Sequence, residues 1–210
     1  MRRKLLENRI QIFLVIATVV MTILRFLLNE KGRTNPDSIR FMRTANVFPV
    51  IDNTTTPLGY PLSLKFLTIF GFDEFWASKV IGILAYFFIV YFAWNKRFYL
   101  RETILVGGLF SFVSIFSYTM SESLMLPFVF IFLYVARQII IGEIKGTKAF
   151  LYLSLILILL YNIRYPALFI IGGVLLYGLL NFRKHYGKTF IFSGLTGLIF
   201  IVLYKFLFID

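Results

Sequence analysis

The chain has 210 residues, of which 59% are hydrophobic, and its mean hydropathy is +0.83. These values exclude an ordinary soluble domain and indicate an integral membrane protein. Because the chain has no cysteine, disulfides, thiol nucleophiles and cysteine-based metal sites are also excluded.

The formal net charge of +12 does not indicate a nucleic-acid partner. The basic residues cluster in short segments between hydrophobic runs, rather than along one face of a soluble domain. This arrangement is typical of membrane topology signals and favours contact with anionic headgroups. The partners expected from charge alone are therefore membrane lipids, with no nucleic acid.

The first hydrophobic run, residues 10–28, follows a basic N-terminal segment. It is about 19 residues long, which is enough to span a membrane. We interpret it as a retained first helix, because no small-residue cleavage motif closes it. A cleaved signal peptide is the alternative.

Hydrophobic runs predict an all-α membrane protein with about seven transmembrane helices in a single module, residues 1–210, without a separate soluble domain. The runs cover residues 10–28, 77–94, 103–119, 123–136, 149–161, 167–180 and 189–208. The long apolar stretch after residue 103 has to break, and the polar patch 117–123 is the predicted position. Residues 162–166 separate the fifth run from the sixth.

The basic residues give this topology a direction. With seven spans, one side receives Arg2, Arg3, Lys4, Arg9, Lys96, Arg97, Arg101, Arg137, Lys145, Lys148, Arg183, Lys184 and Lys188. The positive-inside rule makes that side cytoplasmic. The N-terminus is therefore expected in the cytoplasm. The insert 29–76, the turns 117–123 and 162–166, and the C-terminus are expected on the extracytoplasmic face.

The polar insert 29–76 is predicted to carry interfacial helices. Residues 38–50 contain no Gly and one Pro near their end, and Asp37 or Ser38 could cap a helix there after Pro36. Its apolar face is expected to lie in lipid. That face consists of Phe41, Ala45 and Phe48.

A turn and a second short helix, residues 62–70, are predicted in the rest of the insert. The turn is marked by Pro57, Gly59, Tyr60 and Pro61. An ordered insert of this kind could hold the Asp37 carboxylate at headgroup depth, within reach of a lipid-borne substrate. Alternatively, Asp37 only caps a helix and the nearby arginines only bind phospholipid.

Glu122 and Arg164 lie at the predicted outer ends of spans. Ionisable residues at that depth are costly and often functional. The alternatives are a helix-end cap for Glu122 and a snorkelling side chain for Arg164. His185 is expected to be inert among the cytoplasmic bases. Three further bases near span ends are interpreted as anchors: Arg25, Lys79 and Lys205.

These features resemble the opening module of the GT-C superfamily of membrane glycosyltransferases, in the branch of the protein O-mannosyltransferases and the lipid A aminoarabinose transferase. The resemblance rests on a helix like residues 37–45, a turn like residues 56–62, the pair Ser121-Glu122 and the later Arg164. It covers almost the whole chain in order and topology. Many relatives have a second acid where this chain has Ser38, and most continue beyond the module.

The resemblance implies a glycosyltransferase that moves a sugar from a polyprenyl-phosphate donor to an acceptor hydroxyl, with inversion, in a membrane of the bacterial cytoplasmic type. It implies Asp37 as general base, and Arg40 and Arg164 as ligands of the donor phosphate. Glu122 would orient the acceptor or hold a divalent metal ion, which the sequence does not decide.

Two other classes of protein stay open at this point. One is a non-catalytic or degenerate relative that binds or translocates a lipid-linked substrate, together with a protein partner that the short length would require. The other is a small-solute transporter, although transporters place charged sites near mid-membrane and these spans are almost free of such charge.

Overall fold

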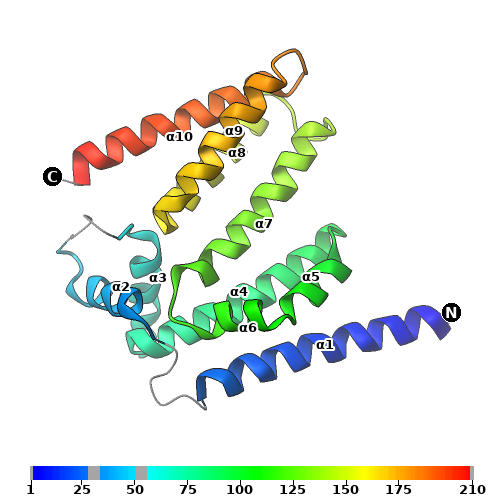
Figure 1. The fold of residues 1–210 in the computed structure, drawn as a ribbon, viewed down its shortest axis with the longest axis vertical. Helices are drawn as coiled ribbons and strands as arrows, with labels where there is room; N and C mark the ends of the chain where they lie inside the picture. The colour runs from blue at the N-terminus through cyan, green and yellow to red at the C-terminus, as the bar shows by residue number, and fades with distance from the viewer. Residues whose placement is uncertain (1, 28–33, 51–55, 209–210) are drawn as a thin grey trace. The chain divides into compact units, whose positions relative to one another are not determined.

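The computed structural model describes residues 2–27, 34–50 and 56–208, and the described residues are all helical or irregular. This confirms the predicted all-α class (Figure 1). The elements are α1 (Arg2–Leu27), α2 (Pro36–Val47), α3 (Gly59–Thr68), α4 (Glu74–Lys96), α5 (Leu100–Gly107), α6 (Phe110–Ser117), α7 (Ser121–Ile140), α8 (Gly146–Ile163), the 3-10 helix η1 (Tyr165–Ala167), α9 (Leu168–Leu180) and α10 (Gly187–Phe208).

Five of these helices are long and apolar enough to cross a membrane: α1, α4, α7, α8 and α10. The pair α5 and α6 makes a sixth span if it is counted as one bent segment. The structure thus supports an integral membrane protein with five or six spans in its described part, rather than the predicted seven. One predicted span that does not qualify is α9. Its 13 residues extend about 20 Å, whereas the hydrocarbon core of a membrane is about 30 Å thick.

The third predicted span, residues 103–119, is broken into two helices, and the sequence does not predict this break. The chain does turn between α6 and α7, inside the predicted patch 117–123. It also bends by 75° between α5 and α6. Gly107 and Gly108 end α5, and glycine is a poor helix former. A Cβ at Gly107 would lie 2.7 Å from the Tyr86 ring, so α5 approaches α4 closely there.

The described residues form two compact units, and the first comprises Met1–Arg43 and Ser63–Pro127. In this unit, α1 and α4 each pack against α5 and α6. The Arg25 guanidinium of α1 lies 3.8 Å from the centroid of the Phe110 ring of α6. The ring of Phe26 meets Trp76 of α4 edge to face, with 6.1 Å between centroids. Arg25 therefore packs inside the unit through an aromatic contact.

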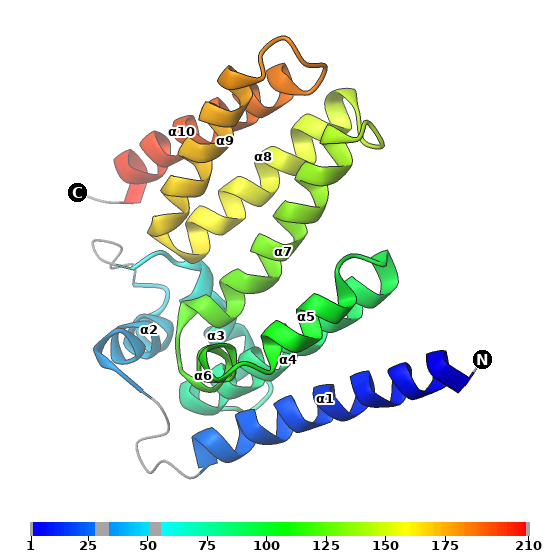
Figure 2. The same cartoon turned by 45° about the vertical axis from the view of Figure 1, so that its right-hand side comes forward.

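The second unit comprises Thr44–Leu62 and Phe128–Asp210. Here α10 packs along both α8 and α9, and η1 joins α8 to α9 (Figure 2). The close approach of α9 and α10 depends on a small residue, because a Cβ at Gly178 would lie 2.8 Å from the Ile191 nitrogen. Small residues at such crossings are a common packing device of membrane helices.

The predicted insert is mostly helical where it is described, and no large loop is evident. Its residues 29–33 and 51–55 lie outside the described residues. Both predicted helices exist as α2 and α3, although each begins earlier than expected. Phe41 and Ala45 are buried within the protein, at 8% and 0% exposure. The expectation of lipid contact is therefore wrong for Phe41 and Ala45, which protein covers, whereas Phe48, the third residue of the predicted face, lies after the end of α2 and is 37% exposed.

Replacing Gly82 with alanine is expected to destabilise the first unit. A Cβ at this position of α4 would overlap the carbonyl oxygen of Phe116 in α6, so the two helices would have to separate. We expect the free energy of unfolding to fall by about 1–3 kcal/mol, the usual cost of overpacking. Thermal unfolding of the purified protein in detergent measures it.

The matched control is Gly172→Ala in α9, where an added Cβ meets nothing within 4 Å. That variant should be as stable as the parent or slightly more stable, because alanine favours a helix. Equal stability of the two variants would contradict the close packing of α4 on α6.

Candidate functional site

The first turn of α2 is fixed by a capping box that begins at Asn35. The Asn35 Oδ1 accepts a hydrogen bond from the Ser38 backbone N–H at 2.8 Å, and the Ser38 Oγ accepts one from the Asn35 N–H at 3.0 Å. Pro36 occupies the first helical position, which suits proline because no intrahelical N–H is needed there. The cap is therefore Asn35, and the prediction of Asp37 or Ser38 as cap is wrong.

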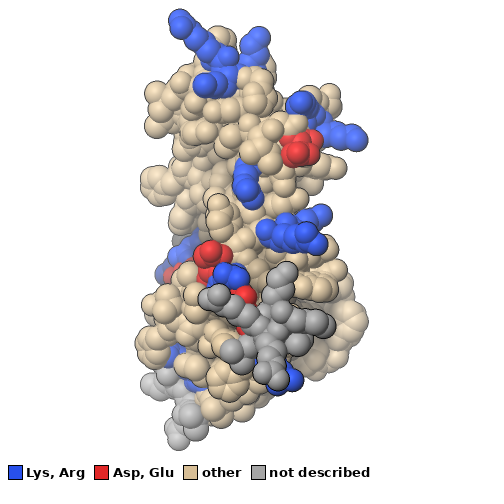
Figure 3. Space-filling model, turned by 90° about the vertical axis from the view of Figure 1, so that its right-hand side faces the viewer, with Lys and Arg blue, Asp and Glu red and all other residues tan. Residues whose placement is uncertain are grey.

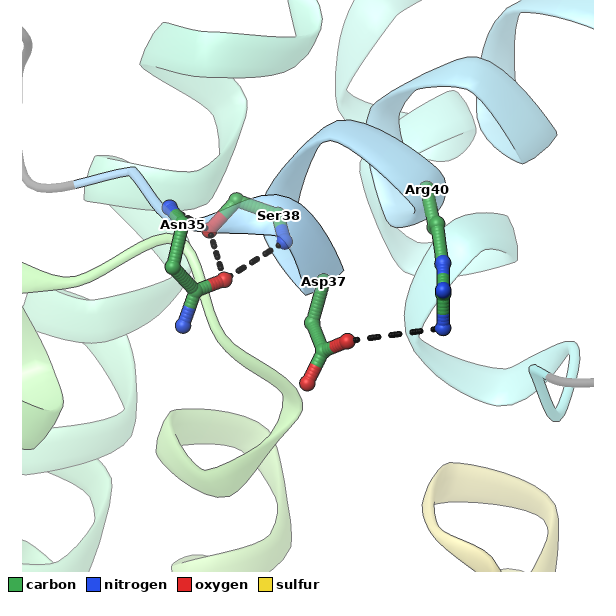
Figure 4. Close-up of polar contacts among 4 residues, drawn as sticks. All are labelled: Asn35, Asp37, Ser38 and Arg40. Carbon is green, nitrogen blue, oxygen red and sulfur yellow. Dashed lines mark hydrogen bonds and ion pairs between the residues drawn. The ribbon is translucent and has the colours of Figure 1, made fainter.

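Because Asn35 supplies the cap, the Asp37 carboxylate points outward from the first turn (Figure 4). It remains 55% exposed, and its Oδ1 lies 3.7 Å from Nη1 of Arg40, which is 60% exposed. An exposed pair of this kind contributes about 0.5 kcal/mol or less to stability. The structure thus brings together two predicted site residues, as a carboxylate and a guanidinium accessible from the surface, and the fold depends little on them.

The opposite side of the same turn enters a buried polar cluster that we call the Thr119 node: Ser38, Ser78, Lys79, Ser117 and Thr119. The Ser38 Oγ donates to the Thr119 carbonyl oxygen at 2.6 Å. The Thr119 Oγ1 pairs with the Ser78 Oγ at 2.7 Å. The Lys79 Nζ donates to the Thr119 Oγ1 and to the Ser117 carbonyl oxygen, both at 2.9 Å. The node joins α2, α4 and the turn after α6.

Lys79 is the functional-site feature that the sequence interpretation missed. It was interpreted as an anchor, but its side chain is only 1% exposed. Its Nζ also lies 4.6 Å from the ring centroid of Phe75 and 5.9 Å from that of Phe26. A buried ammonium is tolerated only when hydrogen bonds and favourable contacts replace its hydration. The signal available in the sequence was Ser78-Lys79 at the start of a span, with a Ser/Thr-rich turn elsewhere in the chain.

Glu122 lies in the first turn of α7, in the same unit as Asp37 and Arg40. It is half-buried and follows directly after the turn that contains Thr119. The bond from Ser38 to Thr119 therefore ties the start of α2 to the turn that leads into Glu122. Three of the predicted site residues thus belong to segments that the Thr119 node connects.

Arg164 belongs to the second unit, where it ends α8 and precedes η1. The predicted turn 57–61 packs beside it, since Pro57, Tyr60 and Pro61 are buried. A Cβ at Gly59 would lie 2.6 Å from the carbonyl oxygen of Asn162, so only glycine allows this approach. The turn and the end of α8, two predicted features far apart in sequence, therefore form one local structure.

A tyrosine cluster surrounds the segment that carries Arg164. The ring of Tyr161 lies 5.3 Å from that of Tyr165 and 5.9 Å from that of Tyr204, measured between centroids. Burial raises the pKa of the Tyr165 hydroxyl above its usual value. This hydroxyl therefore stays neutral at physiological pH. Its side-chain hydrogen bond is with Tyr204, so it belongs to the cluster beside Arg164.

The described part of the chain holds no group of three or more His, Cys, Asp or Glu side chains placed to bind a metal ion. Glu122 is therefore not part of a metal-ligand cluster among those residues.

Comparison of the chain with protein-family models, curated proteins and solved structures finds no match. The fold and its apolar helices define an integral membrane protein that is all-helical, with five or six candidate spans, over residues 2–27, 34–50 and 56–208.

Removing the Thr119 hydroxyl is expected to damage the node. Thr119→Val keeps the side-chain shape but leaves the Lys79 Nζ without one acceptor and Ser78 without its hydroxyl partner. We expect a loss of about 1–3 kcal/mol in the free energy of unfolding, the usual cost of an unsatisfied buried group. Chemical denaturation in detergent measures it.

The matched control is Thr103→Val, because the Thr103 hydroxyl bonds only locally, to the Tyr99 carbonyl oxygen, at an exposed position. This variant should unfold like the parent. If Thr119→Val behaved in the same way, the node would not be a stabilising element.

Proposed function

We propose that this chain is a membrane glycosyltransferase, which transfers a sugar from a polyprenyl-phosphate donor to an acceptor hydroxyl with inversion. The observation that carries the proposal is the placement of Asp37. Its carboxylate is exposed beside Arg40, while the next residue, Ser38, is bonded at 2.6 Å into the polar node at the start of α4. The resemblance of residues 35–72 to the GT-C module supports the same conclusion.

A fixed base suits this reaction. An acceptor oxygen becomes nucleophilic as its proton leaves, so a general base has to be held within hydrogen-bond reach of that proton. The first turn of α2 is held on one side by the Asn35 cap and on the other by the bond from Ser38 to Thr119. Such positioning lowers the entropic part of the barrier. The proposal puts the base at headgroup depth, and the bond from Ser38 to the turn that also contacts α4, a candidate span, supports it.

In the proposed step, Asp37 takes the proton of the acceptor hydroxyl while its oxygen bonds to the anomeric carbon of the sugar. The bond between that carbon and the phosphate oxygen breaks, and its electron pair leaves with the polyprenyl phosphate. The negative charge on the departing phosphate needs positive partners. The resemblance implies Arg40 and Arg164 for this role, and Arg40 is the one that belongs to the same unit as Asp37. Glu122, in the same unit as Asp37, would orient the acceptor or hold a divalent metal ion.

The proposed orientation places the site on the extracytoplasmic face. Basic residues occupy the turns between α4 and α5, between α7 and α8, and between α9 and α10, and the positive-inside rule assigns these turns to the cytoplasm. The start of α2 and the turn after α6 then lie outside, where lipid-linked sugars serve extracytoplasmic acceptors.

A second candidate function is a non-catalytic subunit that binds or translocates a lipid-linked substrate with a protein partner. The environment of Ser38 favours it. Relatives that resemble this chain often have a second acid at this position, whereas here a fully buried serine serves the Thr119 node. The purified protein would then bind polyprenyl phosphate without transferring sugar.

Asp37→Asn is expected to lower transfer by about 100-fold or more, because an amide cannot act as general base. The measurement is release of polyprenyl phosphate from a radiolabelled polyprenyl-phosphate sugar by the purified protein. The matched control is Asp73→Asn, since Asp73 caps α4 through its bond to the Trp76 N–H and asparagine caps equally well. A variant at Asp37 with full activity would refute its assignment as base.

Arg164→Lys is expected to raise the donor KM several-fold while the variant folds normally. A guanidinium binds phosphate through two parallel hydrogen bonds, whereas an ammonium is a point charge. Steady-state kinetics with varied donor concentration provide the measurement, with Arg183→Lys in the exposed turn before α10 as the matched control. Equal donor KM values for both variants would assign Arg164 to anchoring.

A further inference from the structure

A cavity of about 360 Å³ lies at the end of the second unit where α7 meets α8 and α9 meets α10. Its lining combines two kinds of side chain. Ile139, Ile141 and Ile144 contribute an apolar side, and Lys145 and His185 contribute nitrogen donors. The cavity belongs to neither the Asp37 segment nor the Arg164 segment, so the proposed glycosyl transfer does not use it.

The two nitrogen-bearing side chains converge beside Gly142. A Cβ placed on Gly142 would lie 3.6 Å from the Lys145 Nζ and 3.7 Å from the His185 Nε2. Gly142 has a φ of +80°, a left-handed conformation that favours glycine and lets the chain turn sharply between α7 and α8. The turn thereby brings together two donors 40 positions apart in sequence around a space that glycine keeps open.

The electrostatic surroundings favour an anion. Lys145, Gly146 and Ala149 at the start of α8 line the cavity, so the positive end of this helix borders it. Lys and Arg side chains gather over these two turns in the upper part of Figure 3, with an acidic patch among them. The residues involved are Arg137, Lys145, Lys148, Arg183, Lys184 and Lys188, with Glu143 as the nearby acid.

The apolar side of the cavity distinguishes a lipid from a soluble anion. Ile141 is 56% exposed. The helices α7, α8 and α10 that end or begin here are candidate spans, so the cavity lies at a membrane boundary. A lipid headgroup presents a phosphate on one side and its glycerol and acyl stem on the other, which matches both halves of this lining. Basic pockets between membrane helices bind anionic headgroups for this reason.

We propose that this cavity binds the phosphate of an anionic phospholipid headgroup, held by Lys145 and His185. The Lys145 ammonium and the His185 imidazole, in a state that carries a proton on Nε2, each donate a hydrogen bond of about 2.8 Å to a phosphate oxygen. The isoleucines contact the lipid stem. The inference does not depend on the glycosyltransferase assignment.

The test compares Lys145→Gln with Lys148→Gln in the full chain, using native mass spectrometry of protein released from nanodiscs of phosphatidylcholine with added phosphatidylglycerol. The two variants lose the same charge three residues apart, and Lys148 does not line the cavity. Lipid exchange is carried out at about 0.5 M salt, where screening over about 4 Å removes diffuse attraction.

We expect Lys145→Gln to weaken the preference for phosphatidylglycerol about tenfold, and Lys148→Gln to change it by less than about twofold. His185→Gln, a second exposed position, should weaken it in the same direction as Lys145→Gln. Equal effects of the two lysine variants would overturn the proposal in favour of diffuse attraction. Absence of any preference in the parent protein, or displacement of the lipid by millimolar inorganic phosphate, would also overturn it.

Discussion

The structure of the first unit depends on the burial of the Lys79 side chain, whose Nζ needs hydrogen-bond partners inside the protein. Lys79 lies in α4, a candidate span, and is 1% exposed. An ammonium in such a place is costly unless hydrogen bonds replace its water. The acceptors are the Ser117 carbonyl oxygen and the Thr119 hydroxyl, which the chain supplies only because it turns after α6. The path of α5 and α6 is thus constrained by the need to bring that turn back to α4.

The same constraint reaches α2 through Ser38. Residues 37 and 38 are separated by about 100° around the helix, so one can face solvent while the other is buried. Ser38 uses its buried side to bond to Thr119, and Asp37 uses its exposed side to approach Arg40. This division lets the exposed Asp37 carboxylate be held in place by its neighbour, although the carboxylate itself contributes little to the fold. It also explains why serine, rather than a second acid, occupies position 38, since an ionised side chain there would be buried beside a carbonyl oxygen.

Hydrophobic runs predicted the all-α membrane class and the position of most helices, because long apolar segments in a membrane protein have few alternatives to a helix. They did not predict the number of spans, since the bend after Gly107 depends on how closely α5 approaches Tyr86. The cap of α2 was present in the sequence as Asn35 followed by Pro36, a local signal that local rules can identify. The burial of Lys79 has no such local signal, because its partners lie about 40 positions away and only the fold brings them close.

Lysine has two different roles in this chain, and burial decides between them. Lys79 donates its hydrogen bonds to Ser117 and Thr119 inside the protein. It therefore holds α4 against the turn after α6 and is not accessible to a ligand. Lys145 is exposed in a turn and lies beside a cavity, so its donors are available to an anion from the membrane surface. From the sequence, Lys79 is interpreted as an anchor at a span end and Lys145 as one of the basic residues that set the topology. Their chemistry diverges because Thr119 covers one, whereas Gly142 leaves an open space beside the other. A net charge of +12 is therefore a sum of structurally distinct cations, and only the exposed ones contribute to attraction toward anionic lipid.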